Sequence, residues 1–296
     1  MDEATLAAVI RQLDLAPLGD DRFRGDSRDT GAPSLYGGQV VAQALIAAER
    51  TVEGRVPHSL HAYFLLPGDA AAPVEYRVER TRDGGSFSAR RVVALQGDRS
   101  IFVVMVSLQA PEDGLEHAAA MPEVPPPEAL PSFAELRERW LVEAGDEVDP
   151  RVASVLRAGR AFEFRPVDPM NPLRPSPREP RQASWFRAAG PVPDDPRIHR
   201  ALLAYASDTA LAGTPLRPHG LAWPRTRLAS IDHALWFHRP ARVDGWLLHA
   251  MDSPSAQGGR GLARGLVFDR GGALVASVAQ EALFRDPAPR EPRGRR

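Results

Sequence analysis

One carboxylate in this chain has unusual surroundings. Asp208 lies inside the stretch 199–215, which reads as a helix that is apolar on nearly every side. Such a helix is normally buried over most of its surface, and a buried carboxylate must find hydrogen-bond partners or carry a large desolvation cost. Asp208 is therefore either a structural residue that bonds locally or a shielded acid–base group. These residues alone do not decide between the two.

Gln280 is a second polar side chain in an apolar place. It lies in a predicted strand over 273–284 and shares a strand face with Val278, Ala282 and Phe284. A buried amide needs hydrogen-bond partners. It could find them in the backbone, as an ordinary core residue, or in a polar site.

Composition narrows the class of protein. The chain has 296 residues, a net charge of −1 and no cysteine, which excludes disulfides, thiolate metal sites and a cysteine nucleophile. A nearly neutral chain has no overall field that attracts nucleic acid or anionic membranes. The acidic N-terminus does not look like a signal peptide, and no apolar run approaches the roughly 20 residues that span a bilayer. We expect a cytoplasmic protein without membrane insertion or nucleic-acid binding.

The first part of the chain predicts an apolar helix followed by an antiparallel meander. The helix covers 35–52 and begins near the pair Gly37-Gly38. Turn residues separate the strands that follow, which we expect at 58–66, 74–82, 87–96 and 101–108. This order of elements is typical of an α+β fold.

The same order returns in the second part. The Asp208 helix precedes strands that we expect at 230–238, 246–251, 261–268 and 273–284. Pro67 and Pro240 end corresponding strands and lie 173 residues apart, and the pairs Gly84-Gly85 and Gly258-Gly259 lie 174 apart. A repeat of this length indicates an internal duplication, in which each half has one helix that a sheet could wrap.

The duplication divides the chain into parts. We predict an N-terminal half over 1–110 and a C-terminal half over 161–286. Between them, 111–160 is a linker, proline-rich at its start and then holding short helices at 131–141 and 150–158. The arginine- and proline-rich tail, 287–296, is expected to be disordered.

A helix wrapped by a curled meander, present twice in one chain, resembles the double hotdog fold. Five stretches also resemble the bacterial acyl-CoA thioesterase II family, and they follow in order from about residue 30 to 285. They are LYGGQVVAQA (35–44), RPVDPMNP (165–172), AYASD (204–208), SIDHALWFHRP (230–240) and VASVAQE (275–281). Each stretch is weak alone, but the ordered set is specific. The resemblance implies hydrolysis of acyl-CoA thioesters, of medium- to long-chain fatty acyl groups, and assembly as a homodimer or homotetramer.

The resemblance also implies catalytic residues. Family members use an Asp, a Thr or Ser, and a Gln to hold and activate a water, and these match Asp208, Ser230 and Gln280. Serine keeps the hydroxyl but lacks the methyl group that restricts the threonine rotamer. Because a thioester has a good leaving group, a positioned water can attack it directly while Asp208 accepts the proton. No cofactor is implied, since coenzyme A is part of the substrate.

Two further sets of residues are candidates for substrate binding. Backbone N–H groups of Gly37, Gly38 and Gln39 at a helix start could stabilise an oxyanion, although the glycines could equally serve only close packing. Arg260 and Arg264 could contact the phosphates of coenzyme A.

The repeat offset tests whether the site occurs twice. It maps Asp208 onto Ser34 or Leu35, and Gln280 onto Val106 or Ser107. Because the first half then lacks the acid and the amide, we expect one active site per chain.

Two other functions stay open. A non-catalytic acyl-CoA-binding protein could keep this fold, and a hotdog enoyl-CoA hydratase would need an Asp–His pair, whereas no histidine lies within several residues of Asp208. His233 and His238 fall on opposite faces of one predicted strand, so they could not share an ion and we predict no metal site.

Overall fold

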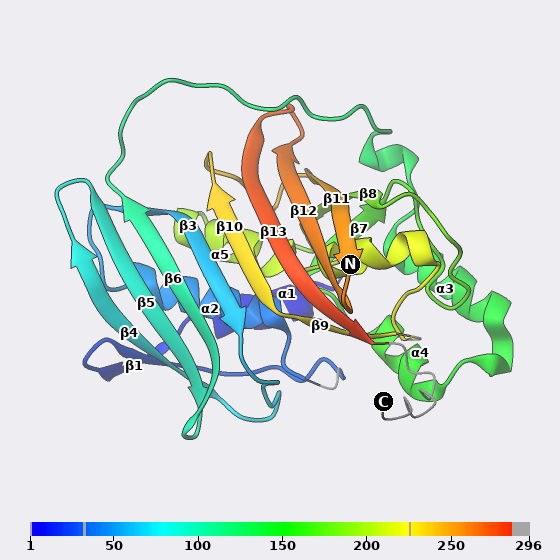
Figure 1. Cartoon of the computed structure of the whole chain (residues 1–296), viewed down its shortest axis with the longest axis horizontal. Helices are drawn as coiled ribbons and strands as arrows, with labels where there is room; N and C mark the ends of the chain where they lie inside the picture. The colour runs from blue at the N-terminus through cyan, green and yellow to red at the C-terminus, as the bar shows by residue number, and fades with distance from the viewer. Residues whose placement is uncertain (1, 32–33, 225, 286–296) are drawn as a thin grey trace, which may run out of the picture.

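The computed structural model describes residues 2–31, 34–224 and 226–285. In this part of the chain one antiparallel sheet of 13 strands dominates (Figure 1), with the order β1-β2-β4-β5-β6-β3-β10-β13-β12-β11-β8-β7 and with β9 paired to β13. The first-half strands are β1 (Ala16–Gly19), β2 (Arg22–Gly25), β3 (Val56–Phe64), β4 (Val74–Asp83), β5 (Phe87–Gln96) and β6 (Arg99–Gln109). The later strands are β7 (Phe162–Pro166), β8 (Arg181–Ala188), β9 (Arg227–Ser230), β10 (Asp232–Phe237), β11 (Leu247–Gln257), β12 (Arg260–Asp269) and β13 (Leu274–Arg285).

The order of the strands is symmetric about its middle. β3 and β10 pair antiparallel at the centre, where His61 lies opposite Ala234. Outward from this pair, β6, β5 and β4 on one side correspond to β13, β12 and β11 on the other. The duplicated arrangement predicted from the sequence, and the tandem hotdog that the resemblance implies, are therefore present, and the two halves share a single continuous sheet.

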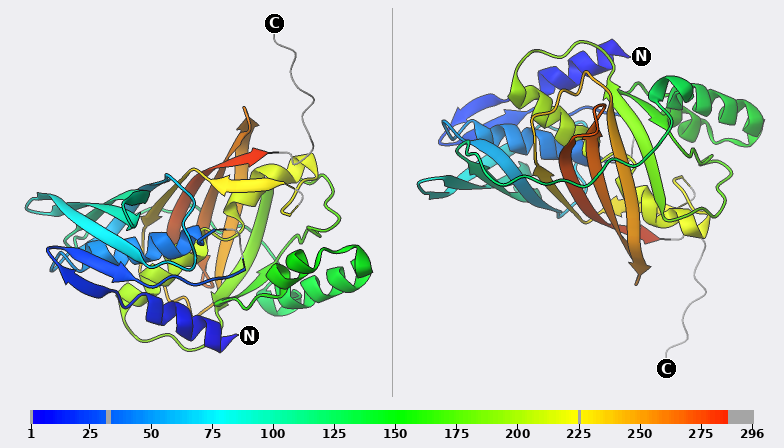
Figure 2. Two further views of the ribbon diagram at one scale, coloured as in Figure 1. Left: turned by 90° about the horizontal axis from the view of Figure 1, so that it is seen from below. Right: turned by 90° about the horizontal axis from the view of Figure 1, so that it is seen from above.

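Two helices lie side by side against the inner face of the sheet, α2 (Gly37–Glu49) and α5 (Pro196–Ser207). Figure 2 shows them on one side of the curled strands, together with α1 (Glu3–Gln12). Every residue of α2 from Gly38 to Ala48 is buried, as expected for a helix with no polar stripe. The start of α2 meets the end of α5, and the end of α2 meets the start of α5, so the helices run antiparallel.

The predicted helix over 199–215 is wrong in its extent. α5 ends at Ser207, so that Asp208 is its C-cap residue, and Ala210 adopts a left-handed conformation with φ 67°. A 3-10 segment, η3 (Leu211–His219), follows and contains Pro215 and Pro218. Proline cannot continue an α-helix because it lacks an N–H and clashes with the preceding turn. Asp208 consequently lies at a helix end and not in its middle.

The predicted strand over 230–238 is also divided. β9 ends at Ser230 and β10 begins at Asp232. The backbone of Ile231 between them bonds to Glu281 on β13 and to Phe64 on β3. The other strand predictions agree with the structure to within a few residues, except that β11 continues to Gln257, beyond the predicted end at Met251.

The segment between the halves covers two surfaces. Its first part packs over the outer face of the second half, where Met121, Val124 and Leu130 contact a cluster containing Trp185 and Trp246. Its second part forms α3 (Phe133–Ala144) and α4 (Pro150–Arg157); the short 3-10 turn η1 (Pro127–Ala129) precedes α3, and η2 (Gly145–Glu147) lies between the two helices. α3 and α4 lie beyond one end of the sheet (Figure 2). The predicted disordered tail, 287–296, lies outside the described residues.

Candidate active site

Asp208 is held by one hydrogen bond from each half of the molecule. Its Oδ2 accepts from the backbone N–H of Gly38 at 3.0 Å, and its Oδ1 accepts from Nε2 of Gln280 at 2.7 Å. The side chain is half-buried and lines a large cavity, so the deep burial expected for a mid-helix residue is not found. Both carboxylate oxygens have strong donors, and the group still faces the cavity.

Gln280 joins the other two predicted catalytic side chains. It is completely buried on the inner face of β13, as its strand parity predicts. Its Nε2 also donates to Oγ of Ser230 at 2.7 Å, so one amide bridges the carboxylate and the hydroxyl. Its Oε1 is buried and has no hydrogen-bond partner among the described residues.

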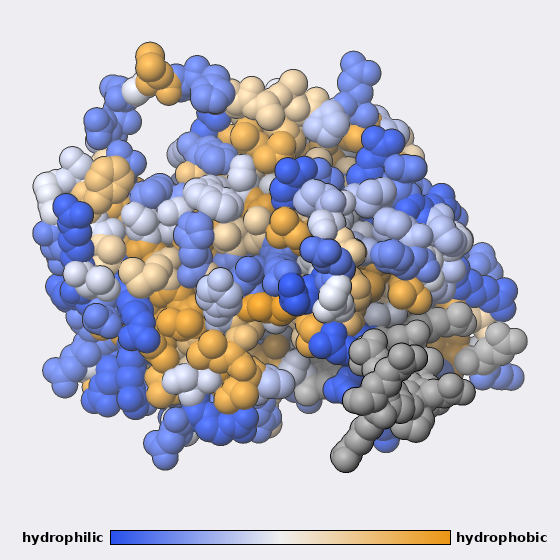
Figure 3. Space-filling view, viewed as in Figure 1, coloured by the Kyte–Doolittle hydropathy of each residue, from blue (hydrophilic) through white to orange (hydrophobic). Residues whose placement is uncertain are grey.

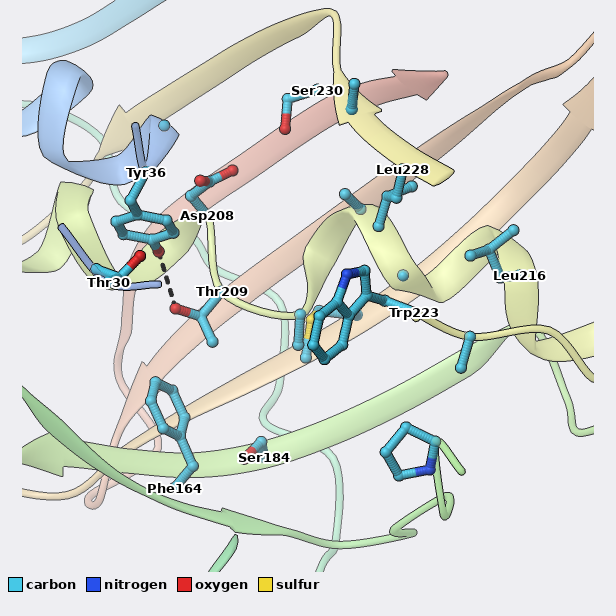
Figure 4. A pocket seen from close by; sticks show the side chains of 18 of the residues that line it. Thr30, Tyr36, Phe164, Ser184, Asp208, Thr209, Leu216, Trp223, Leu228 and Ser230 are labelled. Atoms are coloured by element: carbon cyan, nitrogen blue, oxygen red, sulfur yellow. Dashed lines mark hydrogen bonds between the residues drawn. The ribbon is translucent and has the colours of Figure 1, made fainter. Parts of the chain in front are cut away.

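Ser230 lies at the break between β9 and β10. It is the last residue of β9, and its register partner on β13 is Ala282, two positions from Gln280. Figure 4 shows Ser230 and Asp208 near one another on the cavity wall. Asp232 lies just beyond the break, and its Oδ1 accepts from the backbone N–H of Glu281 at 2.6 Å. The structure thus brings Asp208, Ser230 and Gln280 together and gives Asp232 a structural bond.

The predicted oxyanion residues divide into two groups. Gly37 and Gly38 form the first turn of α2, directly beside Asp208. The N–H of Gly38 is bound to the carboxylate, whereas that of Gly37 has no hydrogen-bond partner among the described residues. The backbone N–H of Gln39 is already used, since it donates to the carbonyl oxygen of Tyr36 at 3.1 Å, and its side chain bonds to the carbonyl oxygen of Asp26 and to Gln43.

Arg260 and Arg264 are not brought to the site. Both lie exposed on β12, where Arg260 donates to Glu281 at 2.9 Å and Arg264 forms an ion pair with Asp252 at 2.5 Å. Neither lines the cavity beside Asp208. The prediction that they bind coenzyme A therefore finds no support in their positions.

The cavity has a volume of about 780 Å³, and its lining is mostly apolar. Its walls come from both halves and from the segment between them, since Phe64, Phe133, Trp140, Phe164, Phe186 and Trp223 all line it. The contribution of α3 through Phe133 and Trp140 was missed from the sequence, because the spacing of these residues fits an ordinary surface helix.

Tyr36 closes the cavity next to Asp208. Its hydroxyl donates to the carbonyl oxygen of Tyr205 at 2.8 Å and lies 2.9 Å from Oγ1 of Thr209 (Figure 4). Burial, reinforced by the charge of Asp208, raises the pKa of Tyr36 well above its usual value. The group therefore stays protonated and fixes the chain on both sides of Asp208.

Two buried histidines lie near the three predicted catalytic residues. His233 continues the cross-strand row of Gln280, and its Nε2 lies 2.9 Å from Oγ of Ser207. His249 lines the cavity. Burial lowers the pKa of both, that of His249 to about 3, so both are neutral near pH 7. His233 lies near Asp208, which was not predicted because the two residues are far apart in the sequence. His238 lies on the other strand face, bonded to Ser277.

The equivalent place in the first half contains different residues. Arg50 follows α2 as Asp208 follows α5, so the sequence offset, which pointed to Ser34 or Leu35, is wrong for this position because η3 lengthens only the second half. Val106 occupies the place of Gln280, and its cross-strand partner Arg90 replaces Ala263. Arg90 is buried and bonded to Thr51 and Asp83, which leaves the first half without acid or amide there.

Comparison with known proteins identifies the family. A family model described as "Acyl-CoA thioesterase" matches residues 155–283, and one described as "Acyl-CoA thioesterase N-terminal domain" matches residues 25–109. The chain is 41% identical to acyl-CoA thioesterase 2 of Haemophilus influenzae over 94% of this chain and 96% of that protein. It is also 41% identical to human acyl-coenzyme A thioesterase 8, over 94% of this chain and 88% of the relative.

Solved structures agree. An acyl-CoA thioesterase II from Mycobacterium marinum superposes with a TM-score of 0.77 at 40% identity, over 95% of this chain and 99% of the other. A hotdog-fold protein from Alicyclobacillus acidocaldarius, at 20% identity and a TM-score of 0.75, supports the fold alone. In the described part of the chain, no helix has the length and apolar character needed to cross a membrane. The chain belongs to the acyl-CoA thioesterase family, with the double hotdog fold.

Proposed function

We propose that this protein hydrolyses acyl-CoA thioesters to a free acid and coenzyme A, using a water activated by Asp208. The observation that carries the proposal is the pair of 2.7 Å hydrogen bonds by which Gln280 joins Asp208 to Ser230 at the wall of the cavity. Thioesterase family models match both halves of the chain, and the named activity of the relatives supports the same chemistry.

The geometry suggests a division of roles. Gly38 and Gln280 fix both oxygens of Asp208, so the carboxylate is oriented before substrate arrives. A water between Asp208 and Ser230 gives up a proton to the carboxylate as its oxygen attacks the thioester carbonyl carbon. When the tetrahedral intermediate collapses, the C–S bond breaks, and the thiolate of coenzyme A takes up the proton. Holding the water in line supplies much of the acceleration, and no cofactor enters the reaction.

The start of α2 is the candidate oxyanion site. The free N–H of Gly37 and the positive end of the helix dipole lie beside Asp208, where negative charge develops on the carbonyl oxygen. Gly38 has a different part in this proposal, because its N–H is already used to orient the carboxylate.

The substrate class follows from the lining. An apolar cavity of about 780 Å³ suits a medium- to long-chain fatty acyl group, whose burial is favourable by about 0.8 kcal/mol per CH₂. An enoyl-CoA hydratase is less well supported, because no histidine is hydrogen-bonded to Asp208 among the described residues: His233 bonds to Ser207, and His249 lines the cavity without a bond to the carboxylate.

We also propose that the protein is a homodimer or homotetramer. Figure 3 shows apolar side chains gathered on the outer face of the sheet, where Tyr63 and Met105 are exposed on the neighbouring strands β3 and β6. A second copy could cover this face. Light scattering of Tyr63→Glu and Met105→Glu should then show a smaller assembly than the wild type. The cytoplasmic location stays a prediction.

The experiment that tests the function is release of free thiol from short-, medium- and long-chain acyl-CoAs by the wild type and by Asp208→Asn. We expect hydrolysis by the wild type and a loss of kcat of at least about 100-fold in the variant, with an unchanged melting temperature. Saturable acyl-CoA binding without any thiol release would favour the binding-protein alternative. Undiminished turnover in Asp208→Asn would exclude this carboxylate as the base.

A further inference from the structure

Two arginines of the described chain line the cavity, and only one of them has an anionic partner. Arg217 forms an ion pair with Asp168, its Nη2 lying 2.5 Å from Oδ2, and donates to the carbonyl oxygen of Glu179. Arg160 makes no hydrogen bond or ion pair with any described residue, and its Nε atom is buried without a partner. Its guanidinium lies over the ring of Phe133, with Cζ 4.9 Å from the ring centroid.

The surroundings of Arg160 leave a positive charge uncompensated. Burial, together with the nearby charge of Arg137, lowers the pKa of Arg160, but a guanidinium in a protein remains protonated. Arg160 is partly buried, with its Nε shielded from solvent, and a shielded ion without a counterion is costly. Arg137 adds a second positive charge and does not compensate the first; its own partners are the carbonyl oxygens of Leu156 and Ala158 and the carboxylate of Glu138.

Arg160 shares the cavity with the reacting groups. Its guanidinium lies close enough to Tyr36 and Tyr205 to favour their ionised forms, and Tyr36 precedes Gly37 and bonds to Thr209, the neighbour of Asp208. The aromatic residues Phe133, Trp140 and Phe164 line the same cavity as Arg160. An anionic group of a molecule bound with its thioester at Asp208 can therefore enter the space that the guanidinium faces.

We infer that Arg160 binds an anionic oxygen group of the substrate, a carboxylate or a phosphate, inside the cavity. The inference rests on the proposed hydrolysis of acyl-CoA and adds a specificity-determining residue to it. The planar guanidinium offers paired N–H donors that match either anion. Binding supplies the missing counterion and the missing hydrogen-bond acceptors in one step.

Two parts of a substrate could provide that anion. One is a phosphate of coenzyme A, present in every acyl-CoA. The other is a second carboxylate at the far end of the acyl chain, present only in a dicarboxylic acyl-CoA. An ordinary fatty acyl chain carries no anion, so the two sources can be separated by three thioesters of one chain length: dodecanoyl-CoA, dodecanedioyl-CoA and dodecanoyl-pantetheine, which lacks the phosphates.

The test compares wild type with Arg160→Gln on these three thioesters. The matched control is Arg151→Gln, an exposed arginine on α4 whose side chain makes no hydrogen bond to the described chain. If a phosphate is bound, kcat/KM of Arg160→Gln falls about 10- to 100-fold on both CoA thioesters and not on dodecanoyl-pantetheine. If a carboxylate is bound, the fall is confined to dodecanedioyl-CoA. Arg151→Gln leaves all three values unchanged.

A purely structural role gives a different pattern. If Arg160 only holds α3 by its contact with Phe133, the variant has a lower melting temperature and loses activity equally on all three thioesters, which overturns the inference. No change on any thioester overturns it too. If Arg160 binds an anion of the substrate, the melting temperature of Arg160→Gln stays equal or rises, because the uncompensated charge is removed.

A binding measurement can test the anion site independently of the proposed hydrolysis. Calorimetric titration of coenzyme A and of dodecanedioate into Asp208→Asn, with and without Arg160→Gln, needs no turnover. Loss of binding of either compound in the double variant supports the anion site even if the wild type releases no thiol, an outcome that would reject only the proposed hydrolysis. Equal binding of both compounds to the two proteins overturns the anion site.

Discussion

The backbone N–H of Gly38 and Oδ2 of Asp208 lie 3.0 Å apart although 170 residues separate them in the sequence. This bond connects the first turn of one half's helix to the end of the other half's helix. The first half therefore contributes donors to a site whose carboxylate, hydroxyl and amide all come from the second half. Duplication allowed such a division, because one of two equivalent sites could lose its acid while its helix kept a supporting role.

Gly38→Ala should damage both the helix contact and the activity. A Cβ at this position would overlap the carbonyl oxygen of Tyr205 and come within 2.6 Å of the Tyr36 ring. Relief requires the helices to move apart, at a cost of about 1–3 kcal/mol for an overpacked core, and moves Gly38 away from Asp208. We expect a lower melting temperature and a loss of kcat of at least about 10-fold. Thermal melts and thiol release measure both.

The control is Gly85→Ala, since a methyl group there would meet nothing within 4 Å. This variant should melt and turn over as the wild type does. Equal behaviour of the two alanine variants would show that the close approach of the helices at Gly38 is unimportant.

The sequence was a good guide to the fold, and the three residues it predicts as catalytic lie together in the structure. Glycine and proline turns separate the strands of both halves, so strand limits such as those of β5 were predictable from local signals. Gln280 was recognisable from strand parity, because an amide on an apolar face needs partners. Both signals are local in the sequence.

What the sequence did not reveal depends on contacts made through the fold. α5 ends at Ser207, before the left-handed Ala210 and the 3-10 segment with Pro215 and Pro218, and this change of helix type was hidden in an apolar run. Arg160 stands in a stretch without periodicity. Its position at the cavity depends on the packing of α3, which the sequence does not reveal. Arg260 and Arg264 seemed free in the sequence, but their partners are on neighbouring strands.

Gln280→Met should lower turnover while keeping the fold. Methionine has a similar length but no donors, so Asp208 and Ser230 both lose the bonds that join them. A hydrogen bond to a charged group contributes about 1.5–3 kcal/mol, which predicts a fall in kcat of roughly 10- to 150-fold. The KM for acyl-CoA should change little. A selective rise in KM, with kcat unchanged, would instead make Gln280 a substrate-binding residue.

Ser230 provides a graded test of the hydroxyl. Ser230→Ala removes the oxygen that accepts from Gln280 at 2.7 Å, and we expect a loss of kcat of about 10- to 100-fold. Ser230→Thr keeps the hydroxyl and restricts its rotamer, so its kcat should stay close to that of the wild type. If the alanine variant were as active as the threonine variant, the hydroxyl would have no part in holding the water.

Glu49 should give the stability of this protein an unusual pH dependence. It lies at the opposite end of the helix pair from Asp208, with a side chain only 6% exposed and in an ion pair with Arg200. Burial raises the pKa of Glu49 to about 7 despite that arginine, and its Oε2 is buried without a partner. The usual pKa of a glutamate, which applies to the unfolded chain, is 4.5, so the folded protein binds one more proton than the unfolded chain between this pH and about 7.

The sign of the effect follows from that proton. A group that is protonated in the folded state and ionised in the unfolded state stabilises the fold at low pH, and this stability is lost as pH rises from about 4.5 to about 7. Its full size is at most about 3 kcal/mol. His233 and His249, whose pKa values burial lowers, act in the opposite direction, because their contribution is lost as pH falls through the unfolded histidine range.

Comparison with Glu49→Gln isolates the carboxyl from the histidines. We expect the variant to gain stability relative to the wild type as pH rises from about 5 to about 8, because its amide cannot ionise. Urea unfolding across this range measures the difference. Glu143→Gln, an exposed change on α3, should differ from the wild type by an amount that does not vary with pH. A pH-independent difference for Glu49→Gln as well would mean that Glu49 is ionised throughout, with Arg200 outweighing the burial.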